Sequence, residues 1–295
     1  MNSPPIKVWI IVFVISASSF ATYSWFSSNN FGVQAEANKI DKLIISNNKI
    51  DSSKTSIVIV GSSITRCAFG THKNNLQQRI SDQIRKPATL LNISISSLNL
   101  ERASELKIFK MISENPPNIL FVESRFLLKF FFNPKKIPFH LTNSIRFNIS
   151  ELKVKLGMLT KNDTNLLISP VWPPCYFNGV FDNATCKEII NRKRIAIGFN
   201  ENTELNEAFA IMRAKGTKII FLGYPNIASI NKSFAKNNSE LVPIFNQYNK
   251  VYQVEYWQNS SIPSENKYYS DGSHMNNEGS KKYVEWFLTQ IKNKL

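Results

Sequence analysis

Apolar runs and helical repeats alternate along the chain from about residue 55 to its end. The run Ser56–Val60 is short and β-branched, as are several later runs that read as buried strands: 88–95, 118–123, 217–222 and 251–256. Helical segments are predicted between and after them, over residues 76–86, 100–113, 201–215, 233–248 and 281–291. Because strands and helices in this order pack through right-handed crossovers, the pattern predicts an α/β fold. We expect a three-layer, doubly wound parallel sheet over residues 54–295.

The N-terminal segment has a different pattern. Residues 8–26 carry no charge, follow Lys7, and have Trp9 and Trp25 near their two ends. That length and these flanks predict a transmembrane anchor over residues 1–28. A cleaved signal peptide stays open as an alternative, because Ser19-Phe20-Ala21 offers small residues for cleavage. Both alternatives place the rest of the chain outside the cytoplasm, with residues 29–53 as a stalk or as a first helix packed on the domain.

Residues 126–200 interrupt the alternation of strands and helices. They hold eleven lysines or arginines against four acids, together with many aromatic residues, including Trp172 and Tyr176. We interpret this region as an insertion at the carboxyl edge of the sheet, where it would form a lid or a binding platform for an anionic or glycosidic substrate. Two alternatives stay open: an aromatic mini-core with solvated lysines, and a surface close to a membrane.

Composition narrows the classes of partner. The 295 residues carry a formal net charge of +15, and 43% of them are hydrophobic. Such a charge indicates an anionic partner, but no nucleic-acid motif is present, so anionic surface glycans or lipid head groups are favoured over nucleic acid. The alternative is that the lysines only solvate the surface.

Cysteine and histidine are both scarce. The chain has three cysteines, of which Cys175 and Cys186 bracket an aromatic, proline-rich loop and could form a local disulfide in an oxidising compartment. The chain also has three histidines, and no residue spacing resembles a zinc site. We therefore expect neither a metal nor another cofactor.

Two segments at opposite ends of the predicted domain carry candidate chemistry. Gly61-Ser62-Ser63 follows the first predicted strand directly, and a serine on a tight turn at that edge is held out in the crevice of the sheet. Near the C-terminus, Asp271 precedes His274 by three residues. An Asp at that spacing can orient an imidazole, which can in turn accept a proton from a serine. Ser63, His274 and Asp271 are therefore candidate triad residues, although the first turn alone also fits a purely structural turn.

In these segments the sequence resembles the SGNH or GDSL hydrolases, whose first block reads roughly G-D-S and whose last block reads D-x-x-H. Ser63 matches the nucleophile, and Asp271 and His274 match the last block. The segment Leu91–Ser97 looks like the family's N-x-S-x-S-G block and places Ser97 where the oxyanion-hole glycine usually sits. The resemblance extends in order from residue 55 to residue 295. It implies a flavodoxin-like sheet and a serine-dependent esterase or acyltransferase.

Two departures from the family pattern concern the oxyanion hole. Ser97 replaces glycine, which is tolerable if only its backbone N–H donates. The third family block, G-x-N-D, is missing, because the strand over 118–123 is followed by Ser124 and Arg125. We expect Ser124 or Arg125 to take over the missing donor role if the chain is catalytic.

The layout is also similar to that of membrane-anchored members of the family that assist O-acylation of surface polymers, such as the alginate O-acetylation and teichoic-acid D-alanylation proteins. That resemblance implies acyl transfer to, or deacylation of, a cell-envelope glycan, beside a multi-pass membrane acyltransferase. Two alternatives stay open: a non-catalytic glycan-binding or assembly module with a degenerate fold, and a simple lipid or small-ester esterase.

Overall fold

The computed structural model describes residues 5–26, 32–48, 53–69, 73–95, 98–130, 194–225, 228–259, 265–270 and 273–295. The chain divides into two compact units. One comprises residues 1–38 and 133–171, and the other comprises residues 39–132 and 172–295. The larger unit contains the sheet and all the described site residues.

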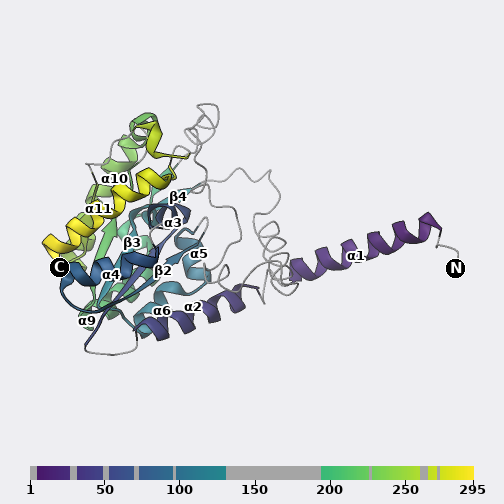
Figure 1. Cartoon of the computed structure of the whole chain (residues 1–295), viewed down its shortest axis with the longest axis horizontal. Helices are drawn as coiled ribbons and strands as arrows, with labels where there is room; N and C mark the ends of the chain where they lie inside the picture. Colours follow the sequence, from purple (N-terminus) through teal and green to yellow (C-terminus); the bar gives the residue numbers. More distant parts are fainter. Residues whose placement is uncertain are drawn as a thin grey trace. The chain divides into compact units, whose positions relative to one another are not determined.

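A five-stranded, wholly parallel sheet forms the centre of the larger unit (Figure 1). Its strand order is β2-β1-β3-β6-β7, with bounds β2 Ala88–Ser94, β1 Thr55–Gly61, β3 Ile119–Glu123, β6 Lys218–Leu222 and β7 Glu255–Trp257. This is the flavodoxin-like order, so the direction of winding reverses between β1 and β3. The predicted doubly wound parallel sheet is confirmed. Ligands in such sheets bind at the carboxyl ends of the strands beside the reversal, which here is the point where Gly61 and Glu123 end their strands.

Helices cover both faces of the sheet. On one face, α3 (Ser63–Phe69) and α4 (Lys73–Ile84) contact the sheet, and both also contact α11 (Asn277–Lys294). Contacts likewise join α5 (Leu100–Glu105), α6 (Ile108–Glu114), α9 (Thr203–Ala214) and α10 (Ala228–Tyr252) into a second helical layer. The two layers explain why β1 and β3 are apolar without alternation, since both of their faces are buried.

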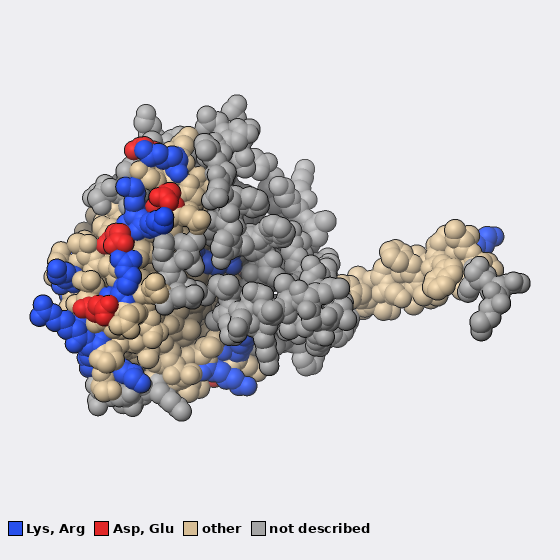
Figure 2. All heavy atoms as spheres, viewed as in Figure 1, with Lys and Arg blue, Asp and Glu red and all other residues tan. Residues whose placement is uncertain are grey.

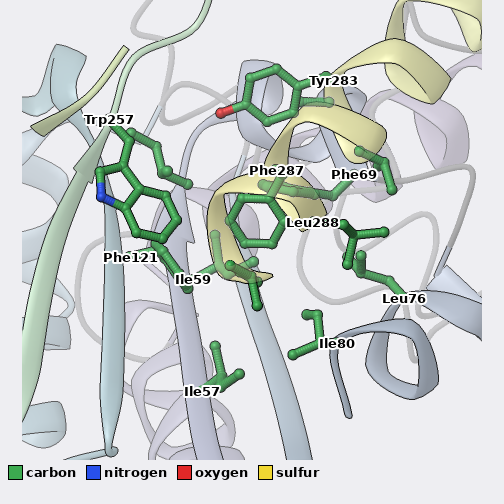
Figure 3. Packing of buried hydrophobic residues seen from close by; sticks show 14 of the residues in the cluster. Ile57, Ile59, Phe69, Leu76, Ile80, Phe121, Trp257, Tyr283, Phe287 and Leu288 are labelled. Atoms are coloured by element: carbon green, nitrogen blue, oxygen red, sulfur yellow. The ribbon is translucent and has the colours of Figure 1, made fainter. Parts of the chain in front are cut away.

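The core between the sheet and the first helical layer is largely aromatic (Figure 3). Phe287 of α11 packs edge-to-face on Phe69 and Phe121, with ring centroids 4.9 and 5.0 Å apart. Trp257 of β7 lies against the same Phe121 ring at 5.4 Å. These fully buried rings join two strands and two helices that are distant in sequence, so α3 and α11 have fixed positions over the sheet.

Two helix predictions differ from the structure. The single helix predicted over 100–113 is broken into α5 and α6, because Lys107 adopts a left-handed conformation with φ 54°. The turn redirects the chain so that α6 buries Ile108 and Phe109. The second difference is at the end of α10, which continues to Tyr252 and is followed by Gln253 with φ 54°. The strand predicted over 251–256 is therefore reduced to β7 at 255–257.

The region predicted as an insertion begins and ends at a pair of short strands. β4 (Leu128–Phe130) and β5 (Arg194–Ala196) are antiparallel, and Phe130 lies opposite Arg194. Residues 131–193, which include Trp172 and Tyr176, lie outside the described residues. The predicted lid or binding platform stays a prediction.

The N-terminal segment forms the helix α1 (Ile6–Phe26), whose described side chains are exposed. Within the described part of the chain, no helix combines the length and the apolarity needed to cross a bilayer. The transmembrane anchor predicted over 1–28 is therefore not supported.

The segment predicted as a stalk or a packed first helix contains α2 (Gly32–Asn48). In its second half, which belongs to the larger unit, Ile40 and Ile44 are buried. Asn48 Nδ2 donates to the carbonyl oxygen of Asn115, 2.6 Å away at the end of α6. Residues 39–48 are therefore packed on the domain.

Candidate active site

Ser63 is placed by the abrupt change from strand to helix after β1. Gly61 is the last residue of the strand and Ser63 the first of α3, so Ser62 alone makes the turn. The carbonyl oxygen of Ser62 accepts a hydrogen bond from the Arg66 N–H at 3.1 Å, which forms the first turn of the helix. The Ser63 side chain is half-buried at the carboxyl edge of the sheet.

His274 is placed by a tight loop in front of α11. The flanking residues Tyr269 and Met275 form an antiparallel bridge, and the carbonyl oxygen of His274 accepts hydrogen bonds from the N–H and hydroxyl of Ser270, at 2.9 and 3.2 Å. Asn276 caps α11, because its side-chain oxygen accepts from the N–H groups of Glu278 and Gly279. The loop and the cap fix the backbone on both sides of the imidazole.

The structure brings these two residues together. Ser63 Oγ lies 2.8 Å from His274 Nε2, although the residues are 211 positions apart in sequence. When Nε2 is unprotonated, the serine hydroxyl donates to it, which is the arrangement that lets a histidine accept the proton of a nucleophilic serine.

Helix α3, which begins with Ser63, packs against α11, which follows His274. The buried Ser280 hydroxyl on α11 donates to the carbonyl oxygen of Ala68 on α3 at 2.9 Å. Close packing is also required at Gly279, where a Cβ would overlap the backbone oxygen of Tyr268. The contact between Ser63 and His274 therefore depends on a helix pair with little freedom to shift.

We expect Ser280→Ala to lower the free energy of unfolding by about 1–2 kcal/mol, because the buried carbonyl of Ala68 loses its donor. The matched control is Thr289→Ala on the same helix, which removes an exposed bond from the Thr289 hydroxyl to the Glu285 carbonyl. Urea unfolding of the two variants makes the comparison. Equal midpoints for both would show that the buried bond has no net effect.

A buried carboxylate lies directly behind the nucleophile turn. Glu123, the last residue of β3, is 2% exposed and accepts hydrogen bonds from the Ser62 N–H at 2.7 Å and from the Ser62 hydroxyl at 2.8 Å. The Thr65 hydroxyl donates to the same carboxylate at 2.7 Å. Sequence reasoning did not select Glu123 as a site residue. The available signal was an acidic residue that ends an otherwise apolar, fully buried strand.

Tyrosines surround this carboxylate. Burial and then the Glu123 charge raise the pKa of Tyr224. Burial raises the pKa of Tyr283 as well, followed by the effect of Tyr224, on which its ring stacks at 5.0 Å. Both phenols therefore stay neutral around neutral pH.

The two residues predicted to complete the oxyanion hole begin the 3₁₀ helix η3 (Ser124–Leu127). Ser124 is buried and hydrogen-bonds Tyr256, whose pKa burial raises and this bond lowers. The Arg125 charge acts on the pKa of Tyr256 in the same direction as this bond. The oxyanion role of Ser124 and Arg125 stays a prediction.

Three other predicted features lie wholly or partly outside the described residues. Asp271 and Ser97 both fall in undescribed segments, so their predicted roles stay predictions. Cys67, on α3, is disulfide-bonded and fully buried. Cys175 and Cys186 also lie outside the described residues, so the bridge predicted between them stays a prediction.

Charged side chains in the described part of the chain are mixed in sign. Figure 2 shows basic and acidic residues interleaved on one face, in keeping with the ion pairs Arg79–Glu285, Lys281–Glu278 and Lys267–Glu265. No group of three or more His, Cys, Asp or Glu among the described residues could hold a metal ion.

Comparisons with known proteins add little to this geometry. No protein-family model matches the sequence, and no characterised protein matches it. Among solved structures, the chain is similar to a family two carbohydrate esterase from Clostridium thermocellum in complex with cellohexaose, with 14% identity and a TM-score of 0.38. The similarity covers 82% of this chain but 64% of that one, which is less than two thirds of its length. The likeness is too weak to assign a family or an activity.

Proposed function

We propose that this chain is a serine esterase in which Ser63 is the nucleophile and His274 the general base. The observation that carries the proposal is the 2.8 Å contact between Ser63 Oγ and His274 Nε2 at the carboxyl edge of a parallel sheet. A serine is a weak nucleophile unless a base accepts its proton, and an imidazole at this distance can do so.

The reaction would proceed in two halves. Ser63 Oγ attacks the ester carbonyl carbon while its proton passes to His274 Nε2, and the tetrahedral intermediate expels the alcohol, which takes the proton from His274. Water then attacks the acyl-enzyme by the same route and releases the acid and Ser63. The backbone N–H of Ser63 would donate to the developing oxyanion, because the Ser62 N–H is already bonded to Glu123. Asp271 would orient the imidazole, a role that rests on its spacing from His274.

We further propose an O-acylated glycan as the substrate class, with a sugar hydroxyl as the alternative acceptor to water. The sequence resemblance to SGNH proteins that modify surface polymers supports this choice, as does the surplus of basic residues over 126–200. The disulfide at Cys67 supports a location outside the cytoplasm, where such bonds persist.

A second candidate is a non-catalytic glycan-binding module. One observation favours it: the strand β3 is followed by Ser124 and Arg125, so the side-chain amide that completes the family's oxyanion hole is absent at that position. Such a module would retain the fold and bind its glycan without forming a covalent intermediate.

Acyl-enzyme formation distinguishes the two candidates. The full chain is mixed with p-nitrophenyl acetate, quenched in acid, digested and mapped by mass spectrometry. We expect a burst of p-nitrophenolate and a single acetyl group on Ser63, with neither in His274→Ala. No burst and no acetyl group, together with binding of acetylated glycan oligomers, would reject the esterase in favour of the binding module.

A further inference from the structure

The contacts of Glu123 connect it to the nucleophile through a single residue. Its carboxylate accepts from both donors of Ser62, the backbone N–H and the hydroxyl. Ser62 precedes Ser63 directly, and its side-chain oxygen also accepts from the Ile64 N–H at 3.2 Å. One carboxylate on β3 therefore holds Ser62, whose carbonyl oxygen accepts the hydrogen bond that forms the first turn of α3.

The contacts of Glu123 extend to the next turn of α3. The Thr65 hydroxyl donates to Oε2, the same oxygen that accepts from Ser62. Every one of these donors is buried or nearly so, and an ionised carboxylate accepts hydrogen bonds without donating any. Hydrogen bonds to a charged acceptor are shorter and stronger than those between neutral groups. The turn from Gly61 to Thr65 is consequently attached to the neighbouring strand as well as to its own helix.

We propose that Glu123 is a positioning residue for Ser63: by holding Ser62 and Thr65, it keeps the Ser63 hydroxyl within hydrogen-bonding distance of His274. The inference rests on the proposed function, because a nucleophile must exist for its position to matter. The chain departs here from the G-D-S pattern, in which the carboxylate lies beside the serine in sequence. In this chain Ser62 occupies that position, and a carboxylate is supplied by the adjacent strand.

The rate at which a serine attacks a carbonyl carbon depends steeply on the position of the serine hydroxyl. A displacement of about 1 Å can lower the rate of a chemical step by about 10²-fold. Glu123→Gln keeps the size of the side chain but removes its charge and replaces one acceptor oxygen with a donor, so the Ser62 and Thr65 donors can no longer all be satisfied. We expect the Ser63 hydroxyl to lose its fixed distance from His274, while the surface that binds the substrate stays in place.

The test uses a fluorophosphonate probe, which forms a covalent bond with an activated serine, on the full chain. The maximal rate of labelling, kinact, and the concentration for half that rate, KI, are measured separately. We expect Glu123→Gln to lower kinact at least about tenfold with KI unchanged. Ser62→Ala removes one of the same bonds without changing Glu123 and should lower kinact in the same direction.

The control is Thr217→Val, which removes another buried hydrogen bond, from the Thr217 hydroxyl to the Pro117 carbonyl at 2.8 Å. Thr217 lies just before β6, at the amino ends of the strands, whereas Ser63 lies at their carboxyl ends. We expect this variant to lose thermal stability while its kinact stays at the wild-type value.

The outcomes separate the two levels of the proposal. If the wild type is labelled at Ser63 and Glu123→Gln is labelled equally fast, the positioning role is overturned and the esterase stands. If the wild type is not labelled, both are overturned. A fall in kinact shared by Thr217→Val would show that general destabilisation, and not position, explains the effect.

Discussion

Replacing Ser63 with alanine is expected to lower kcat for p-nitrophenyl acetate at least about 10³-fold. The variant keeps the backbone N–H at position 63 but has no oxygen to attack the carbonyl carbon or to donate to His274. Its thermal unfolding should match that of the wild type, because the lost side chain is half-buried at the edge of the sheet and the variant adds no bulk. Steady-state kinetics and thermal unfolding, measured on the same preparations, check both expectations.

The same strand provides a matched control. Ser56 lies at the opposite end of β1, where its hydroxyl donates to Asn118 Oδ1 at 3.0 Å and accepts from the Asn118 N–H. Ser56→Ala removes a serine hydroxyl from the same element, so we expect some loss of stability with an unchanged kcat. Wild-type turnover in Ser63→Ala would rule Ser63 out as the nucleophile.

Replacing Gly61 with alanine is expected to lower the free energy of unfolding by about 3 kcal/mol. A Cβ at this position would overlap the Cβ, Oγ1 and Cγ2 atoms of Thr65. Thr65 cannot turn aside cheaply, because it is buried on α3 and its hydroxyl donates to Glu123. The helix must therefore shift away from the strand, which also displaces Ser63. Urea unfolding measures the loss of stability, and p-nitrophenyl acetate turnover measures the displacement.

A double variant isolates the cause. Thr65→Gly removes the three Thr65 atoms that the new Cβ would overlap, although a glycine in a helix costs about 1 kcal/mol. If the overlap explains the defect, Gly61→Ala combined with Thr65→Gly should be more stable than the sum of the two single losses predicts. Strict additivity of the two losses would contradict this account of Gly61.

Much of the fold could be predicted from the sequence, because the information is local. The buried strands are short apolar runs, and β1 and β3 show no alternation because both of their faces are covered. The elements that differ are those where a backbone turn interrupts an otherwise regular pattern. Lys107 and Gln253 both adopt left-handed conformations, which their residue types do not predict.

The candidate site could be predicted only in part. Ser63 was selected because it follows a strand directly, and His274 because an aspartate precedes it at a suitable spacing. Glu123 was not selected, because its partners Ser62 and Thr65 are about sixty residues away in sequence and meet it only when β1 and β3 pair.

By itself the sequence determined most of the strands and helices and indicated Ser63, His274 and Asp271 as candidate residues, since those properties depend on residue type and spacing. The tertiary structure alone decided that a hydroxyl and an imidazole 211 positions apart lie 2.8 Å from each other, and that a carboxylate from a neighbouring strand holds the turn before the serine. Distances between remote residues are set by how strands pair and how helices such as α3 and α11 pack, and no local pattern encodes that packing.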